Sequence, residues 1–349
     1  MKKLMLSILI AVGTALPACA QQPVNGTSYY LPKTTLRFTL LIERTTYTPG
    51  EFAIYADRYM KTGNVQLQPG RTYRIVSTRM VPVGVPDSAK QFTLDLEKKL
   101  SISNIDRDEN GILLAINAKG HRQELPAPFV PDRKKTLPNP REFMNEDILT
   151  AGSTAKMAEL TAQEIYDVRE NRSMLAKGQA EFMPKDGEQL RIMMNSLNRQ
   201  EAALMQTFEG TSVKDTTEVV LNFTPTAETD RQLFFRFSKK LGLTDTDDLG
   251  GSPYYISVKR ANNVPTPAST AREEKKAKDD FGLYVNVPDK IEVTLYKEEQ
   301  PVEHYEVLAG QFGKTEIMSA ELFGKKQTSK LLLYPVTGSI EKIEVENVK

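Results

Sequence analysis

"TAQEIYDVRENRSML", residues 161–175, lies at the centre of a chain whose other segments are short strand-like runs separated by proline and glycine. Its apolar residues recur at the 3.6-residue spacing of an amphipathic helix. Thr161-x-x-Glu164 is a capping box, which predicts the start of that helix. Gly178 is typical of a helix end. The stretch therefore predicts a polar helix inside a largely β protein.

A second helix is predicted immediately downstream. Asp186, with Gln189 three residues later, is a candidate N-terminal cap, and Gly210 ends the pattern. At 1.5 Å per residue, a helix over 187–208 is about 33 Å long. Because the connection between the two helices is short, they are expected to run antiparallel as a helical hairpin.

Four charged residues of the hairpin are candidate binding residues: Glu164, Arg169, Arg172 and Glu201. If the chain folds back near residue 182, Arg172 and Glu201 lie about 13 Å apart along the axis and cannot pair. An unpaired buried charge is costly, so these residues predict a ligand groove or a seam against another domain. The alternative is a solvated face with local ion pairs, and both interpretations stay open.

The flanking sequence predicts an α+β fold, with two β-rich units of sandwich or open-barrel type and the helical hairpin packed across or between them. Leu36, Phe38, Leu40 and Ile42 alternate with other residues in the period-two pattern of a half-buried strand. The predicted division is a signal peptide (1–20), an N-terminal β-rich domain (21–123), a Pro-rich connector (124–152), the hairpin (153–210), and a C-terminal β-rich domain (211–349) with a flexible loop (262–281).

Residues 1–20 have the features of a secretory signal: Lys2 and Lys3, an apolar run, and small residues before Gln21. Two processing routes compete at Cys19. Cleavage before Gln21 removes it, whereas a bacterial lipobox makes it the lipidated first residue, and Pro17 favours plain cleavage. We therefore expect export to the periplasm or outer membrane, with no membrane-spanning segment in the mature chain and Cys19 as the candidate lipid anchor.

Composition excludes several kinds of chemistry from the mature chain. Cys19 is the only cysteine, so disulfides and a cysteine nucleophile are absent from the rest of the sequence. Loss of residues 1–20 leaves 44 basic against 45 acidic side chains, which does not favour nucleic acid as a partner. The acidic stretches 106–111 and 244–251 resemble calcium loops but are more typical of turns. No metal or cofactor is predicted, and His121 and His304 lie in no catalytic motif.

Three parts of the chain resemble an uncharacterised family of exported proteins from Bacteroides-type bacteria, a domain of unknown function. They are "LPKTTLRFTLLIERTTYTPGEFAIYADRYM" from residue 31, the hairpin from "AGSTAKMAEL" to "QTFEG", and the C-terminal run from "GLYVNVPDKIEVTL" through "QFG" to "YPVTGSIEKI". The resemblance implies an envelope location and supplies no catalytic residues.

Two functional hypotheses follow. The first is a non-enzymatic envelope protein that binds an envelope partner or ligand, or has a structural role, through the surface near the hairpin. The second is a hydrolase of envelope or dietary polymer that uses acidic residues. A pocket with two facing carboxylates, or a histidine bonded to Ser or Thr, favours the enzyme. A rimmed apolar patch favours binding.

Overall fold

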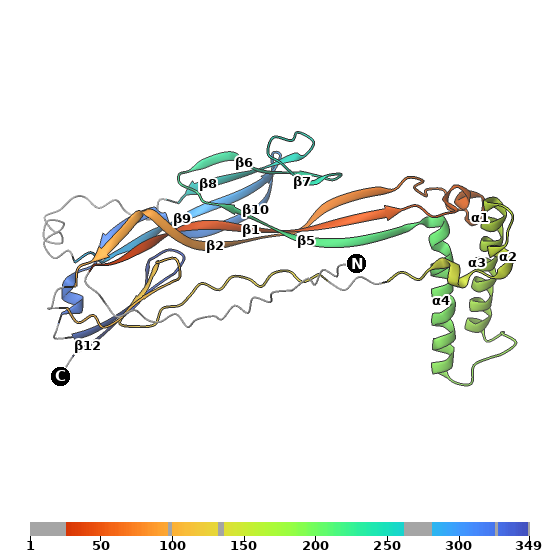
Figure 1. Cartoon of the computed structure of the whole chain (residues 1–349), viewed down its shortest axis with the longest axis horizontal. Helices are drawn as coiled ribbons and strands as arrows, with labels where there is room; N and C mark the ends of the chain where they lie inside the picture. The colour runs from red at the N-terminus through yellow and green to blue at the C-terminus, as the bar shows by residue number, and fades with distance from the viewer. Residues whose placement is uncertain (1–25, 97–99, 132–135, 262–280, 325–326, 348–349) are drawn as a thin grey trace, which may run out of the picture.

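The computed structural model describes residues 26–96, 100–131, 136–261, 281–324 and 327–347. The described residues form three antiparallel sheets that extend along one long axis, with the two long helices at one end (Figure 1). The predicted signal peptide, Cys19 and the predicted loop 262–281, apart from Phe281, lie outside the described residues.

A three-stranded sheet in the order β2-β1-β5 forms the spine of the molecule. β1 (Thr27–Thr48) pairs along nearly its whole length with β2 (Gly70–Leu94), and β5 (Thr211–Phe223) flanks its other edge. The sequence predicts two separate strands, 71–81 and 91–96, where the structure has the single strand β2. Pro82 and Pro86 lie between the two predicted runs, and they are accommodated because β2 is an edge strand, where a proline costs no interior hydrogen bond.

A five-stranded sheet packs against the spine as the second layer of a sandwich. Its order is β10-β9-β8-β6-β7, from β6 (Thr229–Ser238), β7 (Gly242–Thr244), β8 (Ser252–Arg260), β9 (Tyr284–Lys297) and β10 (Gln300–Ile317). Leu36 and Phe38 of β1 are fully buried against Val293 and its neighbours in this sheet. The predicted alternation of β1 thus sets one of its faces into the core.

A four-stranded sheet lies at the end opposite the helices, in the order β12-β11-β4-β3. It consists of β3 (Ile105–Arg107), β4 (Leu113–Ile116), β11 (Gln327–Leu333) and β12 (Ile340–Asn347). Its core contains Tyr29 of β1 and Val285 of β9. The sequence analysis missed β7, which has only three residues, and β12, an edge strand in which half of the residues are charged.

Strands from the predicted N-terminal and C-terminal β units belong to the same sheets. β5, from beyond the hairpin, pairs with β1 over 13 positions, and residues from both units fill each of the sandwich cores. The chain therefore combines antiparallel β layers with a distinct helical end, as the α+β class predicts.

The helices cluster where β1 ends and β5 begins (Figure 1). Short turns η1 (Ala53–Tyr55), α1 (Ala56–Met60), η2 (Pro140–Phe143) and α2 (Glu146–Leu149) surround the long helices α3 (Thr154–Lys177) and α4 (Gly187–Glu209); η3 (Ala320–Phe323) lies elsewhere. The expectation that the pair packs across or between the β units is wrong, because α3 and α4 project from the end of the spine.

Candidate functional site at the hairpin tip

The helical hairpin is anchored to the spine by the half that lies nearest to it. Phe208 of α4 packs on Phe52, with ring centroids 5.6 Å apart, and both side chains are fully buried. The backbone N–H of Phe52 donates to the Thr207 carbonyl at 2.7 Å. Ile165 of α3 joins the same core. This contact fixes the direction in which the hairpin leaves the β body.

The helix boundaries follow the predicted caps with one correction. Gly178 ends α3 in the left-handed conformation, and Asp186 caps α4 by accepting the Gln189 N–H at 2.8 Å. The predicted start at Thr161 is wrong, because α3 begins at Thr154 with Ser153 as its cap. Thr161 is buried inside the helix, and its hydroxyl bonds to the Met157 carbonyl. A capping-box pattern can therefore occur within a helix as well as at its start.

Three of the predicted binding residues pair with one another in the α3–α4 seam. Arg169 Nε lies 2.6 Å from Glu201 Oε1, and Arg172 Nη1 contacts the other oxygen of the same carboxylate. Arg172 also donates to Asn198 Oδ1 at 3.0 Å. The expectation that Arg172 and Glu201 cannot meet is wrong. The helices fold back nearer residue 185 than 182, which brings Arg172 opposite Asn198, and the long arginine side chain spans the remaining turn.

Glu164, the fourth predicted residue, lies in the same seam nearer to the β body. Its carboxylate accepts hydrogen bonds from Gln200 Nε2 at 3.0 Å and from Asn145 Nδ2 at 3.1 Å. The structure thus brings all four predicted residues to one interface and supplies each with protein partners. We refer to Glu164, Arg169, Arg172 and Glu201 as the seam cluster.

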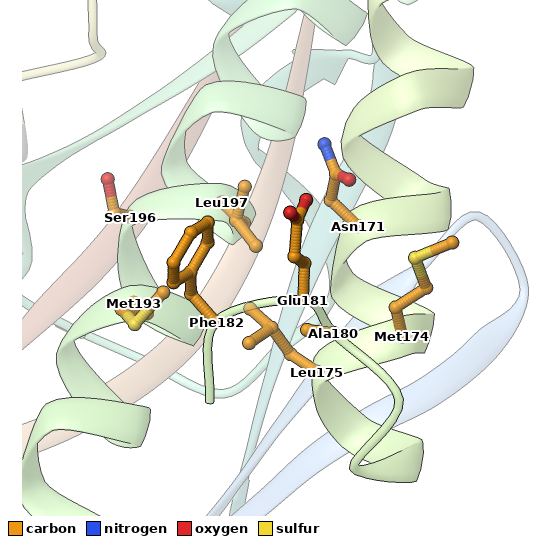
Figure 2. A pocket seen from close by; sticks show the side chains of 9 residues that line it. All are labelled: Asn171, Met174, Leu175, Ala180, Glu181, Phe182, Met193, Ser196 and Leu197. Atoms are coloured by element: carbon orange, nitrogen blue, oxygen red, sulfur yellow. The ribbon is translucent and has the colours of Figure 1, made fainter. Parts of the chain in front are cut away.

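Next to the seam cluster, the two helices and the loop between them line an open cavity of about 480 Å³. Figure 2 shows side chains from α3, from α4 and from the connecting loop converging on it. Its lining is Asn171, Met174, Leu175, Ala180, Glu181, Phe182, Met193, Ser196 and Leu197. Glu181 is the one charged residue among them, so the cavity presents mainly apolar atoms and thioether sulfur.

Apolar side chains at this end of the hairpin are unusually exposed. Phe182 is 80% exposed and Ile192 57%, and Met174, Met183 and Met193 are also exposed. Within α3 and α4, Leu175 is the one buried residue between Val168 and Ala203. We call this end, residues 171–197, the hairpin tip. Clustered exposed apolar groups rimmed by polar residues are typical of interaction sites.

The sequence analysis assigned the hairpin correctly but selected its charges and missed its tip. Leu175 and Leu197 fit the seam pattern, so their spacing gave no reason to separate them from core residues. Phe182 and Met183 lie in a loop between two polar helices, where exposed large apolar residues are uncommon. The position of these two large apolar residues in a loop was the sequence feature that could have identified the tip.

One histidine on the five-stranded sheet contacts a hydroxyl group, which is part of what a catalytic site would need. His304 Nδ1 lies 3.1 Å from the Thr294 hydroxyl, the kind of contact expected to favour an enzyme. The two residues face each other directly across β9 and β10, so a contact is what the register imposes. Neither lines the tip cavity, and both lie on an exposed strand surface. His121 lies 3.7 Å from Glu341 and is also exposed.

In the two acidic loops considered for calcium, oxygen atoms already accept hydrogen bonds from protein groups. Asp108 accepts the N–H groups of Asn110 and Ile112, which closes the predicted hairpin turn. Arg236 donates to the carbonyls of Thr246 and Gly251 and so uses oxygens that a cation would need. Within the part of the chain that the structure describes, no three His, Cys, Asp or Glu residues are placed to hold a metal ion.

The strand motifs that carried the family resemblance have structural contacts. Gln311 of "QFG" donates to the carbonyls of Thr34 and Pro225 and accepts the Thr34 N–H. Asn286, buried in β9, donates to the carbonyls of Pro32 and Thr337, the latter in "YPVTGS". These amides join β1 to the C-terminal part of the chain. The motifs therefore account for the β body, while the hairpin motif contains the tip.

Comparison with known proteins gives a family and no relative of known function. Across the described residues, no helix combines the length and apolar character needed to cross a bilayer. Neither the curated proteins nor the solved structures contain a match to this chain. The family model described as Domain of unknown function (DUF4831) matches residues 25–341. Because the match covers nearly the whole chain, this protein belongs to the DUF4831 family.

Proposed function

We propose that this protein is an exported, non-enzymatic binding protein of the cell envelope that presents its hairpin tip to a partner protein. The observation that carries the proposal is the exposed apolar cavity between α3 and α4, held away from the β body. Export rests on residues 1–20, which have the features of a signal peptide.

The chemistry of the tip favours an apolar protein segment with an adjacent basic residue. A cavity of about 480 Å³ admits large side chains, and burying one such side chain stabilises a complex by about 1.5–3 kcal/mol. Met174 and Met193 can adapt to the shape of the incoming group. Glu181, the charged residue of the lining, then pairs with a lysine or arginine of the partner.

The seam cluster has a supporting role in this proposal. Glu201 pairs with both Arg169 and Arg172, so these groups are engaged within the hairpin rather than open to a ligand. They join the two helices immediately next to the cavity. The tip cavity does not support the hydrolase alternative, because it contains a single carboxylate and glycoside hydrolysis ordinarily uses two.

Site-specific photocrosslinking tests the proposal. A photoreactive phenylalanine analogue replaces Phe182 in one protein and Leu249 in another, since these positions are 80% and 83% exposed. We expect a discrete crosslinked protein from envelope extract at position 182, absent at position 249, and lost when Leu197→Ser disrupts the cavity. With that partner purified, Glu181→Lys should weaken binding at least tenfold.

Two outcomes contradict the proposal. Identical crosslinks from positions 182 and 249 mean that the tip has no specific role. A crosslink only to a second copy of this chain, with a dimer in sedimentation experiments that Phe182→Ser dissociates, makes the tip a self-association surface instead.

A further inference from the structure

Residues 123–129, where the chain enters the Pro-rich connector, lie on the outer face of the spine sheet and cover a second cavity there. Gln123 Nε2 donates to the Pro82 carbonyl of β2 at 2.8 Å, and the Phe129 N–H donates to Glu218 Oε2 of β5 at 2.6 Å. The connector, yellow in Figure 1, is thus fastened to both edges of the sheet. The space beneath it is about 270 Å³.

Two arginines from neighbouring strands line this cavity: Arg37 is half-buried and Arg79 is exposed at its edge. Arg79 of β2 lies opposite Thr39 of β1, so Arg37 is its diagonal neighbour on the same face, with backbones roughly 7–8 Å apart. Neither guanidinium forms an ion pair with any described residue. Two like charges thus share one cavity, and neither has a carboxylate within ion-pair distance.

The rest of the lining supplies apolar walls and hydroxyl groups. Leu41, Pro126 and Phe129 provide apolar surface on both sides, and Thr39 and Ser77 add hydroxyls that can donate hydrogen bonds. An aromatic ring beside two guanidinium groups suits a ligand with a flat apolar body and an anionic end. The cavity is small, just below the usual range of about 300–1,000 Å³ for ligand pockets, so it suits a ligand of few atoms.

We propose that Arg37 and Arg79 form a binding site for a small organic carboxylate. A guanidinium fork matches the two oxygens of a carboxylate, and the two arginines can approach it from adjacent strands. Glu218 also lines the cavity, so its net charge is +1 and favours a monoanion. A phosphate dianion is repelled by the Glu218 carboxylate. This site is independent of the hairpin tip and of its proposed partner.

The test is to titrate the chain from residue 21 onward with sodium benzoate and to follow binding by NMR chemical shifts. Saturable binding is expected, with shifts that localise to the cavity. Arg37→Gln and Arg79→Gln should each weaken binding at least tenfold. Arg71→Gln is the matched control, since Arg71 is exposed on β2, lies outside the cavity, and should leave binding unchanged.

A charge variant separates specific recognition from general attraction to arginine. Glu218→Gln keeps an oxygen for the Phe129 N–H and removes the negative charge, so phenyl phosphate should bind this variant more tightly than it binds the unaltered protein. The proposal is overturned if benzoate does not saturate, if Arg71→Gln weakens binding as much as Arg37→Gln, or if inorganic phosphate binds the unaltered protein as well as benzoate.

Discussion

At the scale of single residues, one carboxylate organises the polar part of the hairpin. Glu201 receives Arg169 on one oxygen and Arg172 on the other, in a seam where its side chain is only 14% exposed. The two arginine side chains are each about one-third exposed, so water solvates part of their charge. Pairing of this kind fixes the helix register more than it adds stability.

Glu201→Ala should therefore lower the free energy of unfolding by about 1 kcal/mol, well below the 3–5 kcal/mol typical of a fully buried pair, because both arginines can turn to solvent. Urea unfolding followed by circular dichroism measures the change. Glu188→Ala removes an exposed pair with Arg191 in the first turn of α4 and serves as control, with a smaller loss expected than for Glu201→Ala. A loss above 3 kcal/mol for Glu201→Ala would show that the arginines stay trapped without their partner.

The sequence alone could not show that the residues of the seam cluster pair with one another. Its four members were identified from their positions on a helical wheel, but whether Arg172 meets Ile192 or Asn198 depends on how the loop 178–186 divides between the helices. A shift of three residues in the fold-back point changes the prediction from unpaired to paired. Loop conformation of this kind is set by tertiary contacts that periodicity does not encode.

At the scale of elements, capping chemistry predicted the hairpin better than it predicted the strands. Asp186, Gly178 and Gly210 marked real helix ends because each satisfies backbone groups locally. β2 was divided in the prediction because its prolines are local signals too, and only its position at the sheet edge makes them acceptable. Local rules therefore succeeded where the tertiary setting did not alter their meaning.

The two halves of the hairpin should differ in dynamics. Residues 158–168 of α3 and 203–208 of α4 pack on each other and on the short helical segments next to the spine, while the tip contributes Leu175 alone to the buried set. Amide hydrogen exchange should be faster in residues 171–177 and 187–197 than in the packed half, because local opening there exposes little apolar surface. Equal protection in both halves, particularly if it rises with protein concentration, would indicate that the tip is covered in solution.

At the scale of the whole molecule, strand length determines the shape. β1 has 22 residues, which at about 3.3 Å per residue extends roughly 70 Å. β2 runs back beside it, and residues 123–131 also lie along the sheet (Figure 1). The fold class was predictable from alternation, but the elongation was not, because alternation over 36–42 gives no measure of how far pairing continues.

Small-angle X-ray scattering should show this elongation. A compact protein of this size has a radius of gyration of about 20 Å. The chain from residue 21 should give a clearly larger value and a maximum dimension above roughly 70 Å. Glu201→Ala should leave the scattering curve unchanged, since the seam cluster lies within the hairpin. A radius of gyration near 20 Å would contradict the extended pairing of β1 and β2 from which the elongation follows.

The connection between β1, β2 and β5 has a mechanical consequence. A pull on the tip, directed away from the four-stranded sheet, acts parallel to these strands, whereas their hydrogen bonds lie across it. Tension is then shared by many bonds at once instead of opening them one by one. The sparsely packed ends of α3 and α4 unfold before the strands separate. Under tension the β body is therefore stiff, and the hairpin tip is the part that deforms.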